Sequence, residues 1–182
     1  MRATALHHGV CIFLTGLSGA GKSTIATALA DAVQQTLSCP VTLLDGDVVR
    51  THLSKELGFS RADRDTNIER IAFVAAEVVK HGGIVISAAI APYEAARTAA
   101  RQRIEANGRF VLVHLSTPLT VCEARDVKGL YAKARRGELT MFTGVTDEYE
   151  PPVRAELTID ASKTSVEDAV AALLNKITKG DA

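Results

Sequence analysis

The chain has 182 residues, of which 47% are hydrophobic and 23% are charged, with 21 basic and 21 acidic side chains. The length suits one domain spanning residues 1–182, and the balanced charge argues against a general nucleic-acid-binding protein, which needs a basic surface. No apolar stretch is long enough to span a membrane or to serve as a signal peptide, and three cysteines lie far apart, so we expect a reduced, cytoplasmic protein without a membrane partner.

The elements that the sequence predicts alternate between apolar strands and helices. In chain order they are a strand at 10–14, a helix at 23–37, a strand at 41–44, helices at 48–57 and 61–80, a strand at 84–89, a helix at 92–106, a strand at 110–115, a short helix at 117–123, a strand at 157–160 and a helix at 165–179. Because each strand is almost continuously apolar and helices separate the strands, we expect an α/β fold with a five-stranded parallel sheet and helices on both faces.

One long segment, residues 125–149, does not fit this alternation. It contains several lysines and arginines, three glycines and no sustained apolar periodicity. This composition is typical of a mobile lid whose cations meet phosphates as it closes over an active site. The alternative for its first part, residues 125–136, is a basic surface helix, because runs of charge are usually solvated.

The junction between the first strand and the first helix carries a phosphate-binding loop. It follows the pattern Gly-x-x-x-x-Gly-Lys-Ser, and its residues in order are Gly16, Leu17, Ser18, Gly19, Ala20, Gly21, Lys22 and Ser23. Glycines let successive backbone N–H groups point at one anion, and the helix N-terminus adds positive charge. Lys22 can reach the β- and γ-phosphates, and the Ser23 hydroxyl can hold the Mg²⁺ that bridges them. The sequence therefore predicts that the chain binds a nucleoside triphosphate together with Mg²⁺.

Two carboxylates follow the second predicted strand. Asp45 and Asp47 would lie at the carboxyl edge of the sheet, beside the phosphate loop and the segment 90–93 that follows the third strand. One carboxylate could hold a metal-bound water, and the other could orient or deprotonate an attacking hydroxyl. The alternative is structural, with Asp47 near the cap of the next helix and Asp45 in a turn. Capping and catalysis are compatible, so we favour the catalytic interpretation.

A second group of polar residues could bind an anionic acceptor. Arg50 lies one helical turn after Asp47, and Arg64 and Asn67 lie three residues apart at the start of the next helix. Arginines at such positions can hold an anion by bidentate contacts. A solvated charged face explains the same spacing, because acidic and basic residues surround this pair in the sequence.

Several separate motifs between about Phe13 and Asp160 resemble those of the adenylylsulfate kinase (APS kinase) family. They are the loop from Gly16 to Thr24, Leu44-Asp45-Gly46-Asp47-Val48-Val49-Arg50, Leu57-Gly58-Phe59-Ser60 with Asp63-Arg64 and Asn67, Ile90-Ala91-Pro92-Tyr93, the lid motif from Cys122 to Tyr131 with Lys133-Ala134-Arg135, Phe142-Thr143-Gly144, and Tyr149-Glu150-Pro151. The phosphate loop occurs in many families, whereas the Leu-Gly-Phe-Ser segment and the lid motif are far more restrictive.

The resemblance implies transfer of the γ-phosphoryl group of ATP to the 3′-hydroxyl of adenosine 5′-phosphosulfate (APS), giving 3′-phosphoadenosine 5′-phosphosulfate (PAPS) and ADP in sulfate activation. It implies that Lys22 and Asp45 act in catalysis with Asp47, which would orient or deprotonate the hydroxyl, and that Ser23 and Asp45 serve Mg²⁺. ATP would contact the loop from Gly16 to Thr24, and Arg125 from the lid. The residues implied for APS are Asp47, Arg50, Phe59, Arg64, Asn67, Ile90, Lys128 and Phe142. Among them, the two phenylalanines would stack on adenine, and the two arginines and Asn67 would hold the phosphosulfate. The resemblance also suggests a homodimer.

The chain departs from the family pattern at two positions. Some relatives have serine in the Ile-Ser-Pro-Tyr motif, where a phosphoserine intermediate has been proposed, but this chain has Ala91. Phosphate must therefore pass directly between the two bound nucleotides. Met141 stands where relatives usually have a small or charged residue, and nothing in the sequence explains it.

Two other functions remain open from the residues. The phosphate loop alone also fits another small-molecule kinase of this architecture, acting on a sugar acid or a nucleoside monophosphate. A non-catalytic, nucleotide-sensing regulatory domain is disfavoured, because such a domain is expected to lose the loop lysine or the strand-end aspartates, and this chain retains them.

Overall fold

A computed structural model describes residues 9–179 of the chain. Its centre is a five-stranded sheet in the order β2-β3-β1-β4-β5, in which every neighbouring pair of strands is parallel. The strands are β1 (Val10–Gly16), β2 (Val41–Asp45), β3 (Ile84–Ala88), β4 (Arg109–Leu115) and β5 (Leu157–Ile159). The prediction of a five-stranded parallel α/β sheet is confirmed.

The sheet separates two apolar cores, and β1 contributes to both. Val10, Ile12 and Leu14 pack on one face, whereas Cys11 and Phe13 pack on the other. Successive side chains of a strand point to opposite faces, so an unbroken apolar run is what a central strand covered on both sides requires. This explains why the first strand shows no polar alternation in the sequence.

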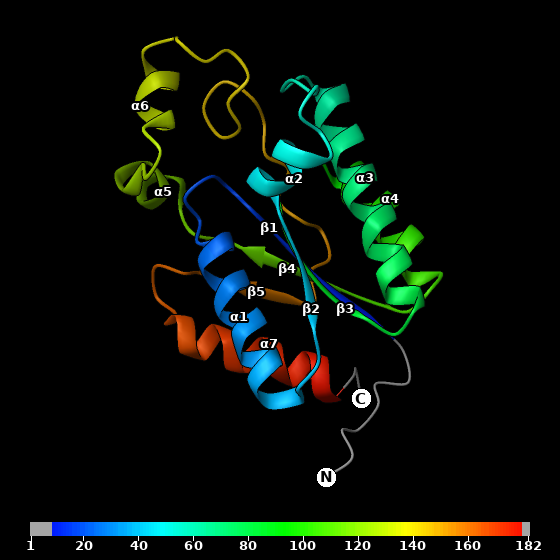
Figure 1. Ribbon diagram of the computed structural model, residues 1–182. Coiled ribbons are helices and arrows are strands. Elements are labelled where there is room, and N and C mark those ends of the chain that lie inside the picture. Colours follow the sequence, from blue (N-terminus) through cyan, green and yellow to red (C-terminus); the bar gives the residue numbers. More distant parts are fainter. Residues whose placement is uncertain (1–8, 180–182) are drawn as a thin grey trace.

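Helices cover both faces (Figure 1). On one face, α1 (Lys22–Leu37) packs against α7 (Val166–Lys179), and on the other α3 (Arg61–Lys80) packs against α4 (Glu94–Glu105). The short helices α2 (Gly46–His52), α5 (Leu119–Arg125) and α6 (Leu130–Arg135) lie at the carboxyl end of the sheet. Within residues 9–179, no helix is long and apolar enough to cross a membrane.

The helix predicted at 48–57 is shorter than expected, and Asp47 is not its cap. Asp45 is the N-cap of α2, because its Oδ1 accepts a hydrogen bond from the backbone N–H of Asp47 at 3.0 Å. The helix ends at His52. Beyond this end, side chains donate hydrogen bonds to backbone carbonyl groups, as Arg70 does to Leu53 O. In contrast, Ser60 caps α3 as predicted, in a capping box with Asp63.

The segment 125–149 is more ordered than the sequence indicated. It contains the helix α6, which the prediction of a mobile lid missed and which its basic-helix alternative partly anticipated. Asp126 stabilises the start of α6, because its carboxylate accepts from the backbone N–H groups of Tyr131 and Ala132. A helix of only six residues is too short for an apolar period to be visible in the sequence. We refer to residues 125–149 as the lid segment.

Candidate active site

The phosphate-binding loop follows a backbone path that requires glycine. Gly16 has a φ of +148°, and a Cβ atom there would lie 2.6 Å from the carbonyl oxygen of Leu115. Gly21 has a φ of +102° and caps α1 in the left-handed region. The loop therefore delivers the chain from the carboxyl end of β1 straight into the N-terminus of α1. This is the arrangement in which backbone N–H groups and a helix N-terminus bind an anion together.

Lys22 is buried within this loop. Its ammonium group donates to the carbonyl oxygens of Gly16 at 2.9 Å and of Leu17 at 2.7 Å. Burial lowers the pKa of Lys22 to about 8, while the carboxylates of Asp45 and Asp47 oppose this shift. An anion beside the ammonium group favours its charged form, so a bound phosphate would raise this pKa again.

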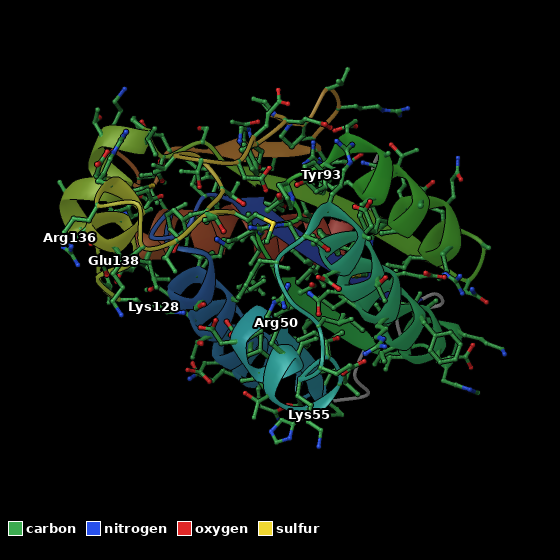
Figure 2. All side chains as sticks on the ribbon, turned by 90° about the horizontal axis from the view of Figure 1, so that it is seen from above. Arg50, Lys55, Tyr93, Lys128, Arg136 and Glu138 are labelled. Atoms are coloured by element: carbon green, nitrogen blue, oxygen red, sulfur yellow. The ribbon has the colours of Figure 1, made fainter. Side chains whose placement is uncertain are left out.

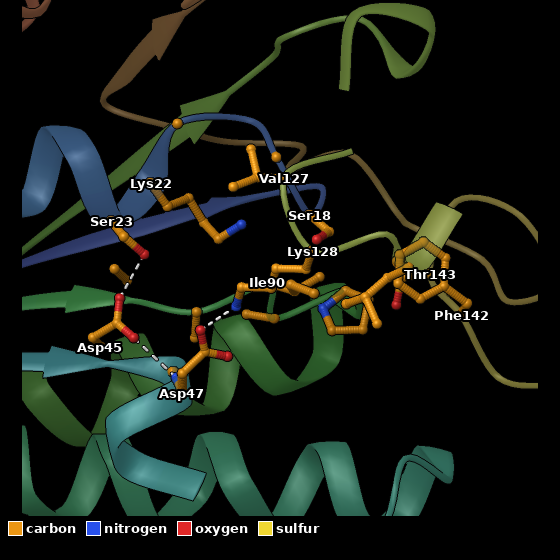
Figure 3. Close-up of a pocket in the computed structure, with 18 of the residues that line it drawn as sticks. Ser18, Lys22, Ser23, Asp45, Asp47, Ile90, Val127, Lys128, Phe142 and Thr143 are labelled. Carbon is orange, nitrogen blue, oxygen red and sulfur yellow. Dashed lines mark hydrogen bonds and ion pairs between the residues drawn. The ribbon is translucent and has the colours of Figure 1, made fainter. Parts of the chain in front are cut away.

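A chain of hydrogen bonds links the loop to the two aspartates (Figure 3). The Ser23 hydroxyl donates to Asp45 Oδ2 at 2.6 Å, and Asp45 Oδ1 accepts from the backbone N–H of Asp47 at 3.0 Å. One carboxylate thus touches the phosphate loop with one oxygen and caps α2 with the other. The cap fixes the first turn of α2, from which the Asp47 side chain extends.

The lid segment reaches Asp47 through Lys128. The Lys128 ammonium forms an ion pair with Asp47 Oδ2, and the two side chains remain 53% and 70% exposed. Figure 2 looks down on this end of the molecule and shows Lys128 on the lid segment and Arg50 on α2. The contact between Lys128 and Asp47 joins two elements that are 81 residues apart in the sequence.

Two further side chains attach the lid segment to the phosphate loop. Arg125 donates to the carbonyl oxygens of Gly19 at 3.1 Å and Ala161 at 2.9 Å, and the Tyr131 hydroxyl donates to Ser18 O at 2.9 Å. The ring of Tyr131 also meets the edge of Phe142 at 4.9 Å between centroids. Residues of the lid motif therefore stabilise the phosphate loop through hydrogen bonds to its backbone.

The arginines of α2 and α3 both lie beside Phe59. The Arg50 guanidinium is 4.5 Å from the centre of the Phe59 ring and donates to the carbonyl oxygen of Gly58 at 2.9 Å. Arg64 donates through Nε to Phe59 O at 2.9 Å, and its guanidinium lies 5.6 Å from the same ring. Burial and the neighbouring Arg64 charge both lower the pKa of Arg50. Two cations this close together favour an anionic partner.

Two buried polar atoms beside these arginines have no hydrogen-bond partner among residues 9–179. They are Oδ1 of Asn67 and Oγ1 of Thr143. Both residues are at least nine-tenths buried, and both line the cavity described below. Because a buried polar atom without a partner costs free energy, these atoms are positions at which a ligand can donate a hydrogen bond or share one.

Hydrogen bonds from buried side chains fix the backbone of the segment that follows β3. Thr15 donates through Oγ1 to Ile90 O at 2.5 Å, and Arg97 donates to Ala91 O at 2.6 Å and Glu150 O at 2.6 Å. Ala91 is buried and has a φ of +45°, which is rare for a residue with a side chain. Arg97 is 1% exposed, so this loop rests on a fully buried cation.

Parts of the phosphate loop and of the lid segment, the two aspartates and the arginines beside Phe59 border one cavity of about 780 Å³. Of the residues predicted for the site, those that line it are Ser18, Gly19, Gly21, Lys22, Ser23, Thr24, Asp45, Asp47, Arg50, Phe59, Arg64, Asn67, Ile90, Arg125, Lys128 and Phe142. Gly16, Leu17 and Ala20 do not. Ala20 is fully buried in the core, and the carbonyl groups of Gly16 and Leu17 accept from Lys22.

Other residues that line the cavity were not predicted from the sequence. Ala161, Thr164 and Val166 follow β5 and line the cavity, and Ala161 lies beside Gly21 and Arg125. The rule that strand ends build such sites applies to β5 as well, so it could have indicated Ala161 and Thr164. Thr143 belongs to the Phe142-Thr143-Gly144 motif, but its spacing did not indicate that it would line the cavity.

A family profile, a sequence relative and a solved structure point to the same family. A sequence profile described as adenylylsulphate kinase matches residues 8–160. An adenylyl-sulfate kinase from Synechococcus sp. (strain JA-3-3Ab) is 52% identical over 162 residues, which cover 89% of this chain and 90% of that protein. A solved APS kinase structure from Mycobacterium tuberculosis, in complex with AMPPNP and APS, has a TM-score of 0.89 and 37% sequence identity, with 93% of this chain and 98% of that chain covered.

Other relatives are much longer than this chain. A sulfate adenylyltransferase from Aspergillus oryzae is 55% identical over 162 residues, which are 89% of this chain but 28% of that protein. The chain therefore spans little more than a quarter of the length of such relatives.

Proposed function

The chain belongs to the adenylylsulfate kinase family, and from this premise we propose that it transfers the γ-phosphoryl group of ATP to the 3′-hydroxyl of APS, giving PAPS and ADP. The reaction would serve sulfate activation. One observation carries the proposal: a single cavity of about 780 Å³ joins the phosphate loop to the arginines beside Phe59, with Asp47 on the wall between them.

The donor would lie along the phosphate loop. Its triphosphate would accept hydrogen bonds from the backbone of the loop and from Lys22, whose ammonium group would leave the carbonyl groups that it now contacts. The adenine would lie toward Arg125, Ala161 and Thr164, on the wall that leads away from the acceptor. The γ-phosphoryl group would then lie at the end of the loop near Ser23, facing Asp47.

The residues beside the loop suit Mg²⁺. The Ser23 hydroxyl and the Asp45 carboxylate lie 2.6 Å apart, and hydroxyl and carboxylate oxygens are ligands that Mg²⁺ accepts together with water and phosphate. When bound there, the ion would neutralise charge on the transferring phosphoryl group. Among residues 9–179, no three His, Cys, Asp or Glu side chains form a metal cluster, so the protein alone would supply few of the ligands.

The acceptor would occupy the other half of the cavity. Phe59 and Phe142 would bind its adenine, while Arg50, Arg64 and Asn67 would bind the phosphosulfate end and Ile90 would contact it from the sheet side. Asn67 would donate to the phosphosulfate through its Nδ2 amide group, and its unpartnered Oδ1 would accept from a hydroxyl or amino group elsewhere on the acceptor. A phosphate–sulfate anhydride is a strongly anionic group, for which two adjacent guanidinium groups are suitable donors.

Asp47 would act on the acceptor hydroxyl. Its carboxylate is largely exposed to the cavity and pairs with Lys128, which would move from Asp47 to the phosphates as the nucleotides bind. Asp47 would then orient the 3′-hydroxyl and accept its proton during transfer. Ala91 offers no hydroxyl for a phosphoenzyme, so the phosphoryl group would pass directly from ATP to APS.

The experiment that tests this proposal is an assay of ADP release in the presence of ATP and Mg²⁺. We expect adenylylsulfate to stimulate ADP release far more than gluconate, shikimate or AMP. Equal or greater stimulation by one of these three would replace the proposal with another small-molecule kinase. A regulatory domain without turnover would release no ADP with any of them.

A homodimer in the cytoplasm also remains a proposal, supported by the family resemblance. Analytical ultracentrifugation of the purified chain tests the dimer directly. A single species with the mass of one chain across the micromolar range would exclude it.

A further inference from the structure

Asp147, in the last part of the lid segment, contacts Arg64, one of the two arginines proposed to bind the acceptor. Its Oδ2 lies 3.4 Å from Nε of Arg64 and accepts a hydrogen bond from the Tyr93 hydroxyl at 2.9 Å. The Arg64 side chain is 7% exposed and that of Asp147 is 24% exposed. The contact thus joins three elements: α3, the segment that follows β3, and the lid segment.

The partners of Arg64 leave one side of its guanidinium available. Nε donates to Phe59 O at 2.9 Å and faces Asp147, and one Nη2 proton is directed to Met141 O at 2.5 Å. Within the described residues, Nη1 makes no hydrogen bond, and Arg64 lines the cavity. A guanidinium is planar with five N–H donors, so fixing Nε and Nη2 also fixes the direction of Nη1.

The turn that carries Asp147 is held together by its backbone and by another side chain. The carbonyl oxygen of Phe142 accepts from the N–H groups of Val145, Thr146 and Asp147, and the Phe142 N–H donates to Thr146 Oγ1 at 2.9 Å. Within the turn, the Asp147 carboxylate contributes only a contact from Oδ1 to the next N–H group, that of Glu148. Removing the Oδ2 contacts would therefore leave the turn, and Phe142 on it, in place.

We propose that Asp147 is a positioning residue that holds the Arg64 guanidinium in the orientation needed for the phosphosulfate group of the acceptor, and that the Tyr93 hydroxyl holds Asp147. This inference rests on the proposed function and extends it. The same turn carries Phe142, so the segment that supplies a ring for the acceptor adenine also orients the cation for its other end. The lid segment would then contribute to binding at both ends of the acceptor, its adenine and its phosphosulfate group.

The expected effect is selective for the acceptor. An ion pair is stronger where water is excluded and the local dielectric constant is low, and the Asp147 and Arg64 side chains are largely shielded from water. We expect Asp147→Ala to raise KM for APS by about tenfold or more and to leave KM for ATP within about twofold, because the described partners of its carboxylate are Arg64, Tyr93 and the Glu148 N–H group, all outside the phosphate loop. Tyr93→Phe removes one hydrogen bond, and we expect a smaller change of about two- to fivefold in the same direction.

Glu148→Ala is the matched control. Glu148 is exposed on the same turn, and its carboxylate makes no hydrogen bond or ion pair within the described part of the chain. We expect this variant to keep both KM values. Asp147→Asn keeps an oxygen acceptor without the charge and should fall between the wild-type protein and Asp147→Ala.

A double-mutant cycle with Arg64→Ala separates positioning from a general structural effect. If Asp147 acts through Arg64, Asp147→Ala causes little further rise in KM for APS once Arg64 is replaced. Additive effects, or an unchanged KM for APS in Asp147→Ala, would overturn the inference. If Asp147→Ala does not fold, as judged by its thermal unfolding, Tyr93→Phe in both backgrounds decides the same question.

Calorimetric titration with adenylylsulfate alone keeps this inference distinct from the proposed function. A wild-type protein that binds adenylylsulfate but does not consume ATP would contradict the proposed reaction, and the ratio of Kd values between the Asp147 variants and wild type would still test the role of Asp147. Absence of binding to the wild-type protein would overturn both.

Discussion

Replacing Asp45 separates two roles that one carboxylate has in this structure. Oδ1 of Asp45 caps α2 by accepting from Asp47 N at 3.0 Å, and Oδ2 accepts from the Ser23 hydroxyl at 2.6 Å. Asp45→Asn keeps an oxygen for the cap but puts an amide NH₂ in place of Oδ2, which cannot accept from Ser23. Asp45→Ala removes both contacts. The two variants therefore differ in the cap and are alike in losing the carboxylate charge at the proposed Mg²⁺ position.

The structure sets different magnitudes for the two variants. Loss of an N-cap side chain costs about 1 kcal/mol of stability, whereas asparagine is as good an N-cap as aspartate. For a domain of this size, about 1 kcal/mol corresponds to a decrease in Tm of about 2–4 °C, which we expect for Asp45→Ala and not for Asp45→Asn. Both variants should lose activity by about 10- to 100-fold, the usual effect of disturbing the groups that orient a metal and its ligands.

The assays are thermal unfolding followed by circular dichroism, and ADP release at saturating ATP, Mg²⁺ and APS. Asp47→Asn is the control, because Asp47 is exposed and its side chain caps nothing, so its Tm should be unchanged while its activity falls. If Asp45→Asn retains wild-type activity, Asp45 is only a helix cap and its proposed catalytic role is wrong. An equal decrease in Tm for the Asn and Ala variants would refute the capping argument.

Three further predictions concern the lid segment, the phosphate loop and the buried support. Lys128→Met should change Tm by less than about 2 °C, because exposed ion pairs such as that between Lys128 and Asp47 contribute little stability. The same variant should lower kcat by about tenfold or more if the lysine moves to the phosphates. Burial lowers the pKa of Lys22 to about 8, so the free protein loses the charged form of Lys22, which binds the triphosphate, as the pH rises above 8. We therefore expect kcat/KM for ATP to fall above pH 8. A flat profile of kcat/KM between pH 7 and 9.5 would contradict this role of Lys22. Arg97→Met should destabilise the protein by about 3–5 kcal/mol in denaturant unfolding, because it removes a fully buried cation from Glu94 and from the Ala91 and Glu150 carbonyl groups, whereas a loss below about 1 kcal/mol would show that the network is dispensable.

Much of the donor side could be predicted because its information is local. The residues of the phosphate loop are consecutive, and each position has a conformational or chemical requirement that can be read from its residue type. Gly16 and Gly21 occupy the backbone conformations that their motif predicted, and Asp45 lies within hydrogen-bonding distance of Ser23 because strands β1 and β2 end at the same edge. The apolar runs of the strands are also local, so the sequence predicted their bounds to within a few residues of those in the structure.

Contacts between distant segments could not be predicted in this way. The helix at 48–57 was expected to be longer, since nothing in its sequence indicates that arginine side chains would take the carbonyl groups beyond His52. Asp147 lies 83 residues after Arg64, and no spacing rule connects them. The interpretation of Arg64 and Asn67 as a solvated face was reasonable from sequence, and burial of both residues contradicts it.

By itself, the sequence determined the α/β class, the phosphate loop and, through its resemblance, the family, because these depend on residue types at short, fixed spacings. Only the tertiary structure decided which side chains meet. Parallel strands bring their carboxyl ends to one edge, and loops of very different length then place Lys128 against Asp47, Asp147 against Arg64 and the end of β5 against the phosphate loop. Those contacts depend on how the lid segment packs, which is a property of the whole chain and not of any motif within it.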